Sequence, residues 1–132
     1  MQSKATPNLF LISESKTTNQ FTIYDQRCVN MKDSVRLNFG CIQDLNLSRY
    51  ITPDWHENGY TVVCGSQTDS KINFWDLRYN KVSDGPSFSI PLDGTKRILP
   101  TMFIPNRDTI VAASSGHVLS WVDYTVQRHV KI

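Results

Sequence analysis

The sequence has few cysteines, and none of them is spaced in a way that suggests a bond or a metal. Cys28, Cys41 and Cys64 form neither a disulfide framework nor a Cys-x-x-Cys metal motif. Thiols that stay reduced fit a cytoplasmic or nuclear compartment. We expect all three to be small buried hydrophobic residues, because free cysteine is among the most buried residue types.

Long apolar runs and a strong charge of one sign are absent as well. No stretch approaches the roughly 20 apolar residues of a membrane span, and residues 1–5 lead into no apolar signal core. The 14 basic and 12 acidic residues are scattered and leave a net charge of +2, which predicts no membrane partner and no nucleic-acid surface. Lys96, Arg97 and Arg107 lie near predicted loops and give only weak support for binding nucleic acid.

Motifs for catalysis are also missing. The sequence has no Gly-x-Ser-x-Gly elbow and no glycine-rich phosphate loop, and His117 and His129 stand alone. The one compact cluster of titratable residues contains Asp54, His56 and Glu57. On a strand, Asp54 and His56 share a face while Glu57 begins a turn, so the spacing gives no metal-binding triad and a solvated strand end is expected. The sequence therefore predicts no enzyme, no cofactor and no metal.

What the sequence does contain is a globular composition with strand signals. It is 39% hydrophobic and 20% charged. Short runs rich in Val, Ile, Thr and aromatic residues are bounded by turn pairs such as Asn58-Gly59 and Asp93-Gly94, and this pattern predicts strands joined by turns. Helical periodicity is nearly absent. Residues from about 40 to 49 are expected to form a loop, and the fold class is expected to be all-β.

The strand-forming runs recur as similar copies. The best-defined copy comprises residues 60–66, a turn containing Asp69, and residues 71–78. A second copy begins near residue 99 and an earlier one near residue 8. Our alignment places Val62 over Ile110, Val63 over Val111, Ser66 over Ser114 and Trp75 over Trp121. The aromatic residues Tyr24, Trp75 and Trp121 then recur at about 45 to 50 residues, close to the period of four-stranded propeller blades.

The middle copy resembles a repeat of the WD-repeat β-propeller family. Residues 64–66, Asp69 and residues 72–76 look like the second strand, tight turn and third strand of such a repeat. The first copy has Tyr24-Asp25 in place of Trp-Asp, and in the third copy Val122 follows Trp121. No copy has the family's Gly-His dipeptide, so the Asp-His-Ser-Trp hydrogen-bond network of the family is not expected. An unrelated antiparallel sandwich with a chance Trp-Asp is the alternative.

The resemblance implies four-stranded antiparallel blades at about 8–39, 51–91 and 99–131 within one region, 1–132. A closed ring needs at least four blades, so the chain is expected to be an incomplete ring, either a piece of a larger propeller or one completed by another chain. Residues 124–130 predict an outer strand directly before the end, which favours a piece from the C-terminal side. The polar first seven residues are poor material for an inner strand.

The residues that carry the repeat are first expected to be structural. Trp75 is bulky and lies on a strand covered on both faces, so packing explains it without a ligand. Asp69 is expected to cap backbone donors of its turn through its carboxylate. The remaining structural positions are Tyr24, Asp76 and Trp121.

The family resemblance implies a non-catalytic scaffold that binds other proteins, including the rest of the propeller, through loops such as the one containing Asp93, Lys96 and Arg97. An alternative rests on Asp-x-Arg at the ends of consecutive copies. Arg27 and Arg78 look like the paired motif through which WD-repeat substrate receptors dock on the propeller adaptor of a cullin-RING ubiquitin ligase. The competing interpretation is that each arginine pairs with its own aspartate or with a neighbouring carboxylate. A nucleic-acid or histone-binding propeller is less favoured.

Overall fold

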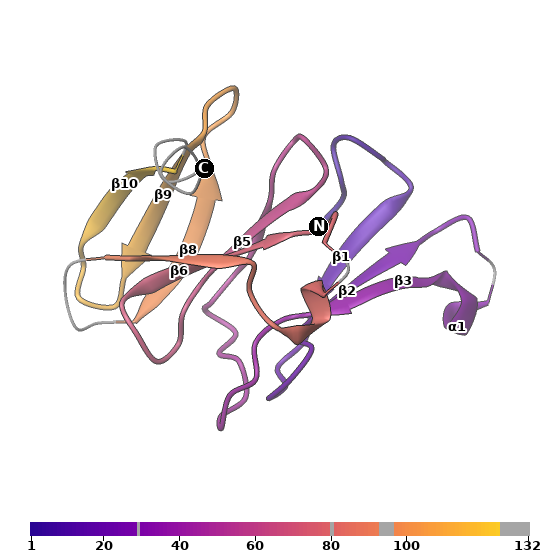
Figure 1. Ribbon diagram of the computed structural model, residues 1–132, viewed down its shortest axis with the longest axis horizontal. Helices are drawn as coiled ribbons and strands as arrows, with labels where there is room; N and C mark the ends of the chain where they lie inside the picture. Colours follow the sequence, from indigo (N-terminus) through magenta and orange to yellow (C-terminus); the bar gives the residue numbers. More distant parts are fainter. Residues whose placement is uncertain (29, 80, 93–96, 125–132) are drawn as a thin grey trace.

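The regular secondary structure of the described residues is almost entirely β-strand (Figure 1). The computed structural model describes residues 1–28, 30–79, 81–92 and 97–124. Across these residues, ten strands form three antiparallel sheets, and helical structure is limited to the four-residue helix α1 (Met31–Ser34) and the 3-10 turn η1 (Val82–Asp84). The predicted all-β class is confirmed.

Each sheet is made from strands that follow one another in the sequence. The first sheet has the order β1 (Leu9–Ser13), β2 (Phe21–Asp25), β3 (Val35–Phe39). The second has the order β4 (Asp54–Trp55), β5 (Thr61–Gly65), β6 (Lys71–Asp76), β7 (Phe88–Pro91). The third has the order β8 (Ile98–Phe103), β9 (Thr109–Ser114), β10 (Leu119–Asp123).

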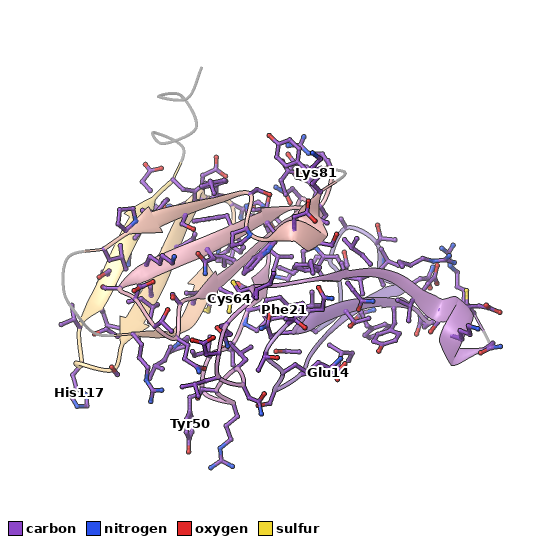
Figure 2. The ribbon with its side chains drawn as sticks, turned by 60° about the horizontal axis from the view of Figure 1, so that its bottom comes forward. Glu14, Phe21, Tyr50, Cys64, Lys81 and His117 are labelled. Atoms are coloured by element: carbon purple, nitrogen blue, oxygen red, sulfur yellow. The ribbon has the colours of Figure 1, made fainter. Side chains whose placement is uncertain are left out.

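The second sheet lies between the other two and is buried on both faces (Figure 1). One core cluster joins its first face to the first sheet, with Val62 and Trp75 against Phe21. The other cluster joins its second face to the third sheet, with Phe74 against Ile110. Figure 2 shows Phe21 and Cys64 inside the molecule, whereas Tyr50 and His117 project away from it. Burial on both faces explains why β5 is apolar at nearly every position instead of alternating.

The same pairing register recurs in the three sheets. Val62 lies opposite Trp75 in the second sheet, and Phe10 lies opposite Tyr24 in the first. In the third sheet, Ile110 lies opposite Val122. Ile110 faces the second sheet, just as Val62 faces the first sheet. The register therefore places Val122, and not Trp121, in the position of Trp75.

The predicted structural role of Trp121 as the counterpart of Trp75 is wrong for this reason. Trp121 lies opposite Val111, on the face of the third sheet that points away from the second sheet. Trp121 is 64% exposed to solvent. The turn between β9 and β10 is one residue shorter than the turn between β5 and β6, whereas our alignment made it two residues shorter. A slip of one residue on a strand moves a side chain to the opposite face.

The first residues add a short stretch to the first sheet. Gln2 forms an antiparallel bridge with Phe10, and the backbone N–H of Leu11 donates to the Met1 carbonyl at 2.8 Å. This polar segment, which we expected to be poor material for an inner strand, pairs with β1 through its backbone at Gln2 and Met1. The outer strand predicted at residues 124–130 lies outside the described residues after Tyr124. The Tyr124 ring itself is buried and packs against Phe74 at 5.4 Å.

The segment after β3 forms the predicted loop. Residues 40–50 contain no strand or helix, and side-chain amides hold them in place. Gln20 accepts from the Cys41 backbone N–H at 2.8 Å and donates to its carbonyl at 2.9 Å. Gln67 accepts from the Ser48 backbone N–H at 2.6 Å. All three cysteines are free thiols, but only Cys64 is fully buried, so the expectation of buried cysteines was wrong for the partly exposed Cys28 and Cys41.

Candidate protein-interaction site

The two Asp-x-Arg motifs adopt the same geometry at the ends of β2 and β6. Arg27 donates from Nε to Asp25 Oδ1 at 3.0 Å and from Nη2 to Oδ2 at 2.7 Å. Arg78 donates to the same two oxygens of Asp76 at 2.9 and 2.6 Å. In each motif the arginine backbone N–H also donates to the aspartate Oδ1. Each guanidinium is therefore held by its own carboxylate in a planar two-bond pair.

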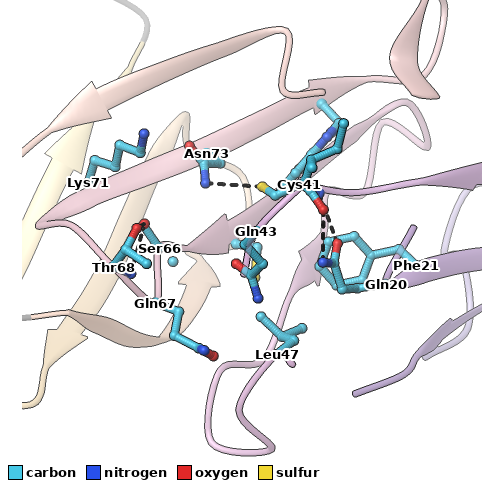
Figure 3. A pocket seen from close by; sticks show the side chains of 14 residues that line it. Gln20, Phe21, Cys41, Gln43, Leu47, Ser66, Gln67, Thr68, Lys71 and Asn73 are labelled. Atoms are coloured by element: carbon cyan, nitrogen blue, oxygen red, sulfur yellow. Dashed lines mark hydrogen bonds between the residues drawn. The ribbon is translucent and has the colours of Figure 1, made fainter. Parts of the chain in front are cut away.

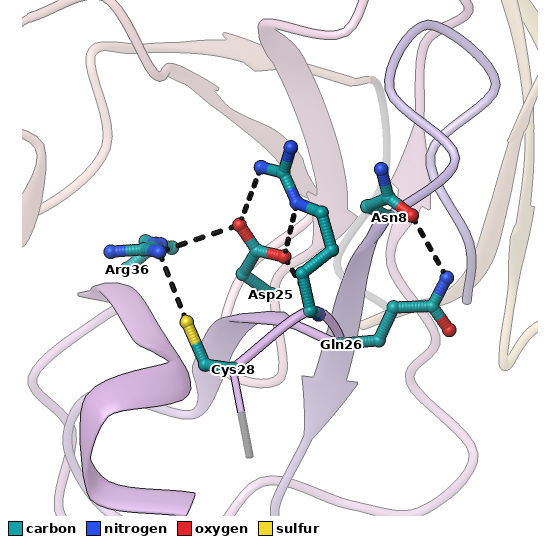
Figure 4. A network of polar contacts seen from close by, with 6 residues as sticks. Asn8, Asp25, Gln26, Cys28 and Arg36 are labelled. Atoms are coloured by element: carbon teal, nitrogen blue, oxygen red, sulfur yellow. Dashed lines mark hydrogen bonds and ion pairs between the residues drawn. The ribbon is translucent and has the colours of Figure 1, made fainter. Parts of the chain in front are cut away.

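The first of these pairs is the more enclosed. Arg36 Nη2 adds a longer contact of 3.4 Å to Asp25 Oδ2 and donates to Cys28 Sγ at 3.2 Å (Figure 4). The side-chain hydrogen bond from Arg27, its backbone N–H and the two positive charges together hold the pKa of the buried Asp25 well below its usual range. The same pairing raises the pKa of Arg27.

The second pair carries an aromatic contact instead of a second arginine. The guanidinium carbon of Arg78 lies 3.9 Å from the centre of the Tyr60 ring, within the range of a cation–π interaction. The hydrogen bond from Arg78 to Asp76 raises the pKa of the arginine. The side chains of Arg27 and Arg78 are nevertheless 64% and 58% exposed, so both guanidinium groups remain accessible.

The other predicted partner-binding residues belong to the loop before β8. Asp93 and Lys96 lie outside the described residues. Arg97 is exposed, and its backbone carbonyl accepts from the Ser115 N–H at 3.0 Å, which joins Arg97 to the turn between β9 and β10.

The predicted role of Asp69 as the cap of its turn is wrong. The backbone N–H groups of Thr68 and Asp69 donate to Ser66 Oγ at 3.4 and 3.2 Å. The Asp69 carboxylate accepts instead from the Thr68 hydroxyl and pairs with Lys71 at 3.5 Å. Ser114 caps the corresponding turn of the third sheet in the same way. Ser66 directly follows β5, and its hydroxyl accepts from the N–H groups two and three residues further along the turn.

The titratable cluster after residue 53 joins two sheets and is not a solvated strand end. Asp54 Oδ2 accepts from the backbone N–H of Phe103 at 2.7 Å, and Glu57 Oε1 accepts from that of Asn106 at 3.1 Å. His56 is largely buried and lies against the Phe103 ring, with Nε2 3.8 Å from Asp108 Oδ1. These side chains therefore connect the second sheet to the third, which sequence spacing could not reveal because their partners lie about 50 residues away.

A small polar cavity lies beside the 40–50 loop (Figure 3). Its volume is about 100 Å³, and its lining includes Gln20, Gln43, Gln67, Asn73 and Lys71. Ligand sites for drug-sized molecules measure about 300–1,000 Å³, so this cavity has room for a few water molecules only.

The outer face of the third sheet presents a row of large apolar side chains. Met102, Val111 and Trp121 lie opposite one another across β8, β9 and β10, and Leu119 lies beside Trp121 on the same face. Met102 and Leu119 are 57% and 58% exposed. We call these four residues the third-sheet face. Sequence analysis missed it, although apolar residues at both odd and even positions of a strand are the signal for two covered faces.

The outer face of the first sheet also presents large apolar side chains. Phe10, Tyr24 and Val35 lie in one row across β1, β2 and β3, with Ile12 beside them. We call these four residues the first-sheet face. Phe10, Ile12 and Tyr24 line a hollow of about 480 Å³. Both ends of the three-sheet stack therefore present apolar side chains.

Within the described residues, no group of three or more His, Cys, Asp and Glu side chains could hold a metal ion. The same part of the chain contains no helix that is both long enough and apolar enough to cross a membrane. No protein-family model matches the chain, and no curated protein matches it significantly. The resemblance to WD repeats therefore depends on the residues quoted above.

Proposed function

We propose that this chain is part of a WD-repeat-like β-propeller that acts as a non-catalytic scaffold in a multi-protein complex. The observation that carries this proposal is the repetition of one strand register in three successive sheets that stack face to face. Aspartates Asp25, Asp76 and Asp123 end the equivalent strands β2, β6 and β10. Such a stack is what successive blades of a propeller provide.

The open ends of the stack support an incomplete ring. In the middle sheet, both apolar faces are covered by neighbouring sheets. The outer sheets have one covered face each, and their other faces retain Trp121, Met102 and Ile12 as exposed large residues. Contiguous apolar surface of this kind marks sites where another protein surface binds. The propeller is proposed to be completed by further sheets on these faces.

A scaffold accounts for the polar residues better than a reaction does. The side chains of Asp54, Glu57 and Asp25 accept backbone or arginine donors that stabilise the fold. The cavity beside the 40–50 loop is too small for most substrates. Binding through the rim loops therefore remains the proposed activity, and a reducing compartment, cytoplasm or nucleus, is proposed because the three thiols are free.

Sequential affinity purification tests the scaffold proposal. A tagged chain is expressed in cells, and a second tag on one captured protein is used for the next step. We expect at least two further proteins to stay together at fixed ratios through both steps. Arg97→Glu should weaken one of these contacts, whereas Lys32→Glu, an equal charge reversal at the exposed start of α1, should not. Loss of every partner in the second step would contradict a scaffold.

The geometry of the Asp-x-Arg pairs favours one second candidate, the substrate receptor of a cullin-RING ubiquitin ligase. The two arginines have matching geometry at equivalent strand ends and both are more than half exposed. Their bonds to Asp25 and Asp76 also agree with a purely structural role.

Capture of the ligase's propeller adaptor separates these two roles. Arg27→Ala with Arg78→Ala should abolish capture if the arginines reach the adaptor, and Arg49→Ala, which removes an exposed arginine from the 40–50 loop, should leave it unchanged. If the parent chain captures no adaptor, or if the double variant captures as much as the parent, the ligase candidate is wrong.

A further inference from the structure

We propose that the third-sheet face of one copy of this chain binds the first-sheet face of a second copy, so that two chains close a ring of six sheets. The inference rests on the proposed function, since it takes the stack to be an incomplete propeller and names what completes it.

The first argument is continuity with the interfaces inside the chain. The face of the second sheet with Val62 and Trp75 packs on the first sheet, and the face of the third sheet with Ile110 and Val122 packs on the second. By register, Phe10 and Tyr24 are the counterparts of Val62 and Trp75. The first-sheet face therefore matches the faces through which the second and third sheets pack on the sheet before them in the chain.

The third-sheet face matches the face through which the second sheet packs on the sheet after it in the chain. Counting from the paired residues, Trp121 precedes Val122 as Phe74 precedes Trp75, so Trp121 corresponds to Phe74. Phe74 is fully buried because it faces the third sheet, where it contacts Tyr124. Trp121 occupies the same register position on the third sheet and is exposed. One chain thus carries both halves of an interface that it already forms twice.

The shapes of the two faces agree with this pairing. The first-sheet face has a hollow of about 480 Å³ lined by Phe10, Ile12 and Tyr24, with Asp25, Gln26, Cys28 and Ser34 at its border. The third-sheet face has the exposed side chains of Trp121, Leu119 and Met102. A hollow with aromatic and aliphatic walls opposite an exposed aromatic residue is the arrangement found at the centres of stable interfaces.

Two copies also supply a number of sheets that propellers use. A contact between two different faces produces an open filament unless the rotation returns to its start, in which case it produces a closed ring. Two chains contribute six sheets, which lies within the range of about four to eight blades found in propellers. In this ring the first and third sheets of each copy become covered on both faces, as the second sheet already is.

Sedimentation velocity on the purified chain, over a range of concentrations, tests the proposal. We expect the parent chain to form a two-chain species and Trp121→Asp and Tyr24→Asp each to form a monomer. Tyr50→Asp is the matched control, because Tyr50 is 59% exposed but lies in the 40–50 loop, and it should stay a two-chain species. Hydrogen exchange of β5 and β6 confirms that each variant is folded.

Mixing the two face variants tests which faces meet. The Trp121→Asp chain keeps its first-sheet face, and the Tyr24→Asp chain keeps its third-sheet face, so the mixture should form a two-chain species that neither variant forms alone. A folded parent chain that remains a monomer, larger open assemblies, or no mixed species would overturn the proposal. The scaffold proposal would survive a monomer if partners still co-purify, and the ring would then be completed by different sheets.

Discussion

Trp75 and Trp121 show how register decides the role of a residue. Trp75 packs against Phe21 at 5.4 Å and Phe39 at 5.8 Å, and its Nε1 donates to the Gly40 carbonyl at 3.3 Å. The Trp121 side chain lies on the face of the third sheet that points away from the second sheet, and it is mostly exposed. The first residue stabilises the boundary between two sheets, whereas the second leaves a surface for association.

This difference predicts unequal effects of truncation. Trp75→Ala should lower the free energy of unfolding by about 3 to 5 kcal/mol, because it removes a buried indole and leaves a cavity. Trp121→Ala should change it by less than about 0.5 kcal/mol, as exposed substitutions usually do. Urea unfolding measures both, in the Tyr24→Asp background so that association does not contribute. Similar losses for the two variants would mean that Trp121 is packed inside the chain.

Asp25 predicts a dependence of stability on pH. Its pKa in the folded chain is lowered by Arg27 and Arg36, so its contribution to stability is fully present above the unfolded-state pKa of about 3.9. That contribution is lost as the pH falls through the lowered folded-state pKa. In urea unfolding at a series of pH values, Asp25→Asn should be less stable than the parent at neutral pH, and the difference should shrink on acidification.

Asp44→Asn is the control for this titration. It removes the same charge from an exposed position in the 40–50 loop. Its stability should follow that of the parent chain at every pH. A constant difference between Asp25→Asn and the parent across the acidic range would show that the carboxylate does not titrate with folding.

At the scale of strands, the sequence was enough to predict where β-structure occurs but not how the third copy pairs. Val, Ile and aromatic residues between turn signals located the strands. The register of β10 depends on the length of one turn, and the match of Trp121 to Trp75 favoured the wrong length. Because a slip of one residue exchanges the two faces, the exposed position of Trp121 could not be predicted.

The candidate site was predictable only where its partners are close in sequence. Asp25 and Arg27 are two residues apart, so spacing alone suggested the pair that the structure contains. The acceptor roles of Asp54 and Glu57 depend on donors 49 residues away. The third-sheet face likewise combines three strands, so it follows from pairing and not from any local motif.

Gly65 provides a prediction about the contact between sheets. A Cβ atom added at Gly65 would overlap with the backbone carbonyl oxygen of Ile98. It would also lie 2.8 Å from the carbonyl carbon and 2.8 Å from the Cγ2 atom of Ile98. Gly65→Ala must therefore push β5 and β8 apart, and its thermal midpoint should fall by several degrees, about what a loss of 1 to 3 kcal/mol produces.

The Gly65→Ala, Ile98→Leu double variant separates backbone from side-chain contact. Leu has a single γ-carbon and therefore lacks the Cγ2 methyl of Ile98, but it has the same backbone carbonyl, so stability should not be restored. Recovery of the Ile98→Leu midpoint in the double variant would place the clash in the side chain and contradict close backbone approach.

At the scale of the whole molecule, the stack of three sheets gives an order of local stability. The second sheet has a core cluster on each face, whereas the first and third have one each. Opening β5 or β6 to solvent requires separating the second sheet from a neighbour. Within the described residues, β10 pairs with β9 and has one face in a core cluster, so opening it there breaks fewer contacts.

Amide hydrogen exchange should therefore be slowest in β5 and β6 and faster in β10 and β1, because local opening costs more where both faces are buried. Mass spectrometry on the monomeric Trp121→Asp variant measures this without protection from a second copy. In the parent chain the two-chain ring should slow exchange in β9, β10, β1 and β2 while changing β5 and β6 little. Equal exchange in β10 and β6 of the monomeric variant would contradict a stack whose stability is concentrated in its middle sheet.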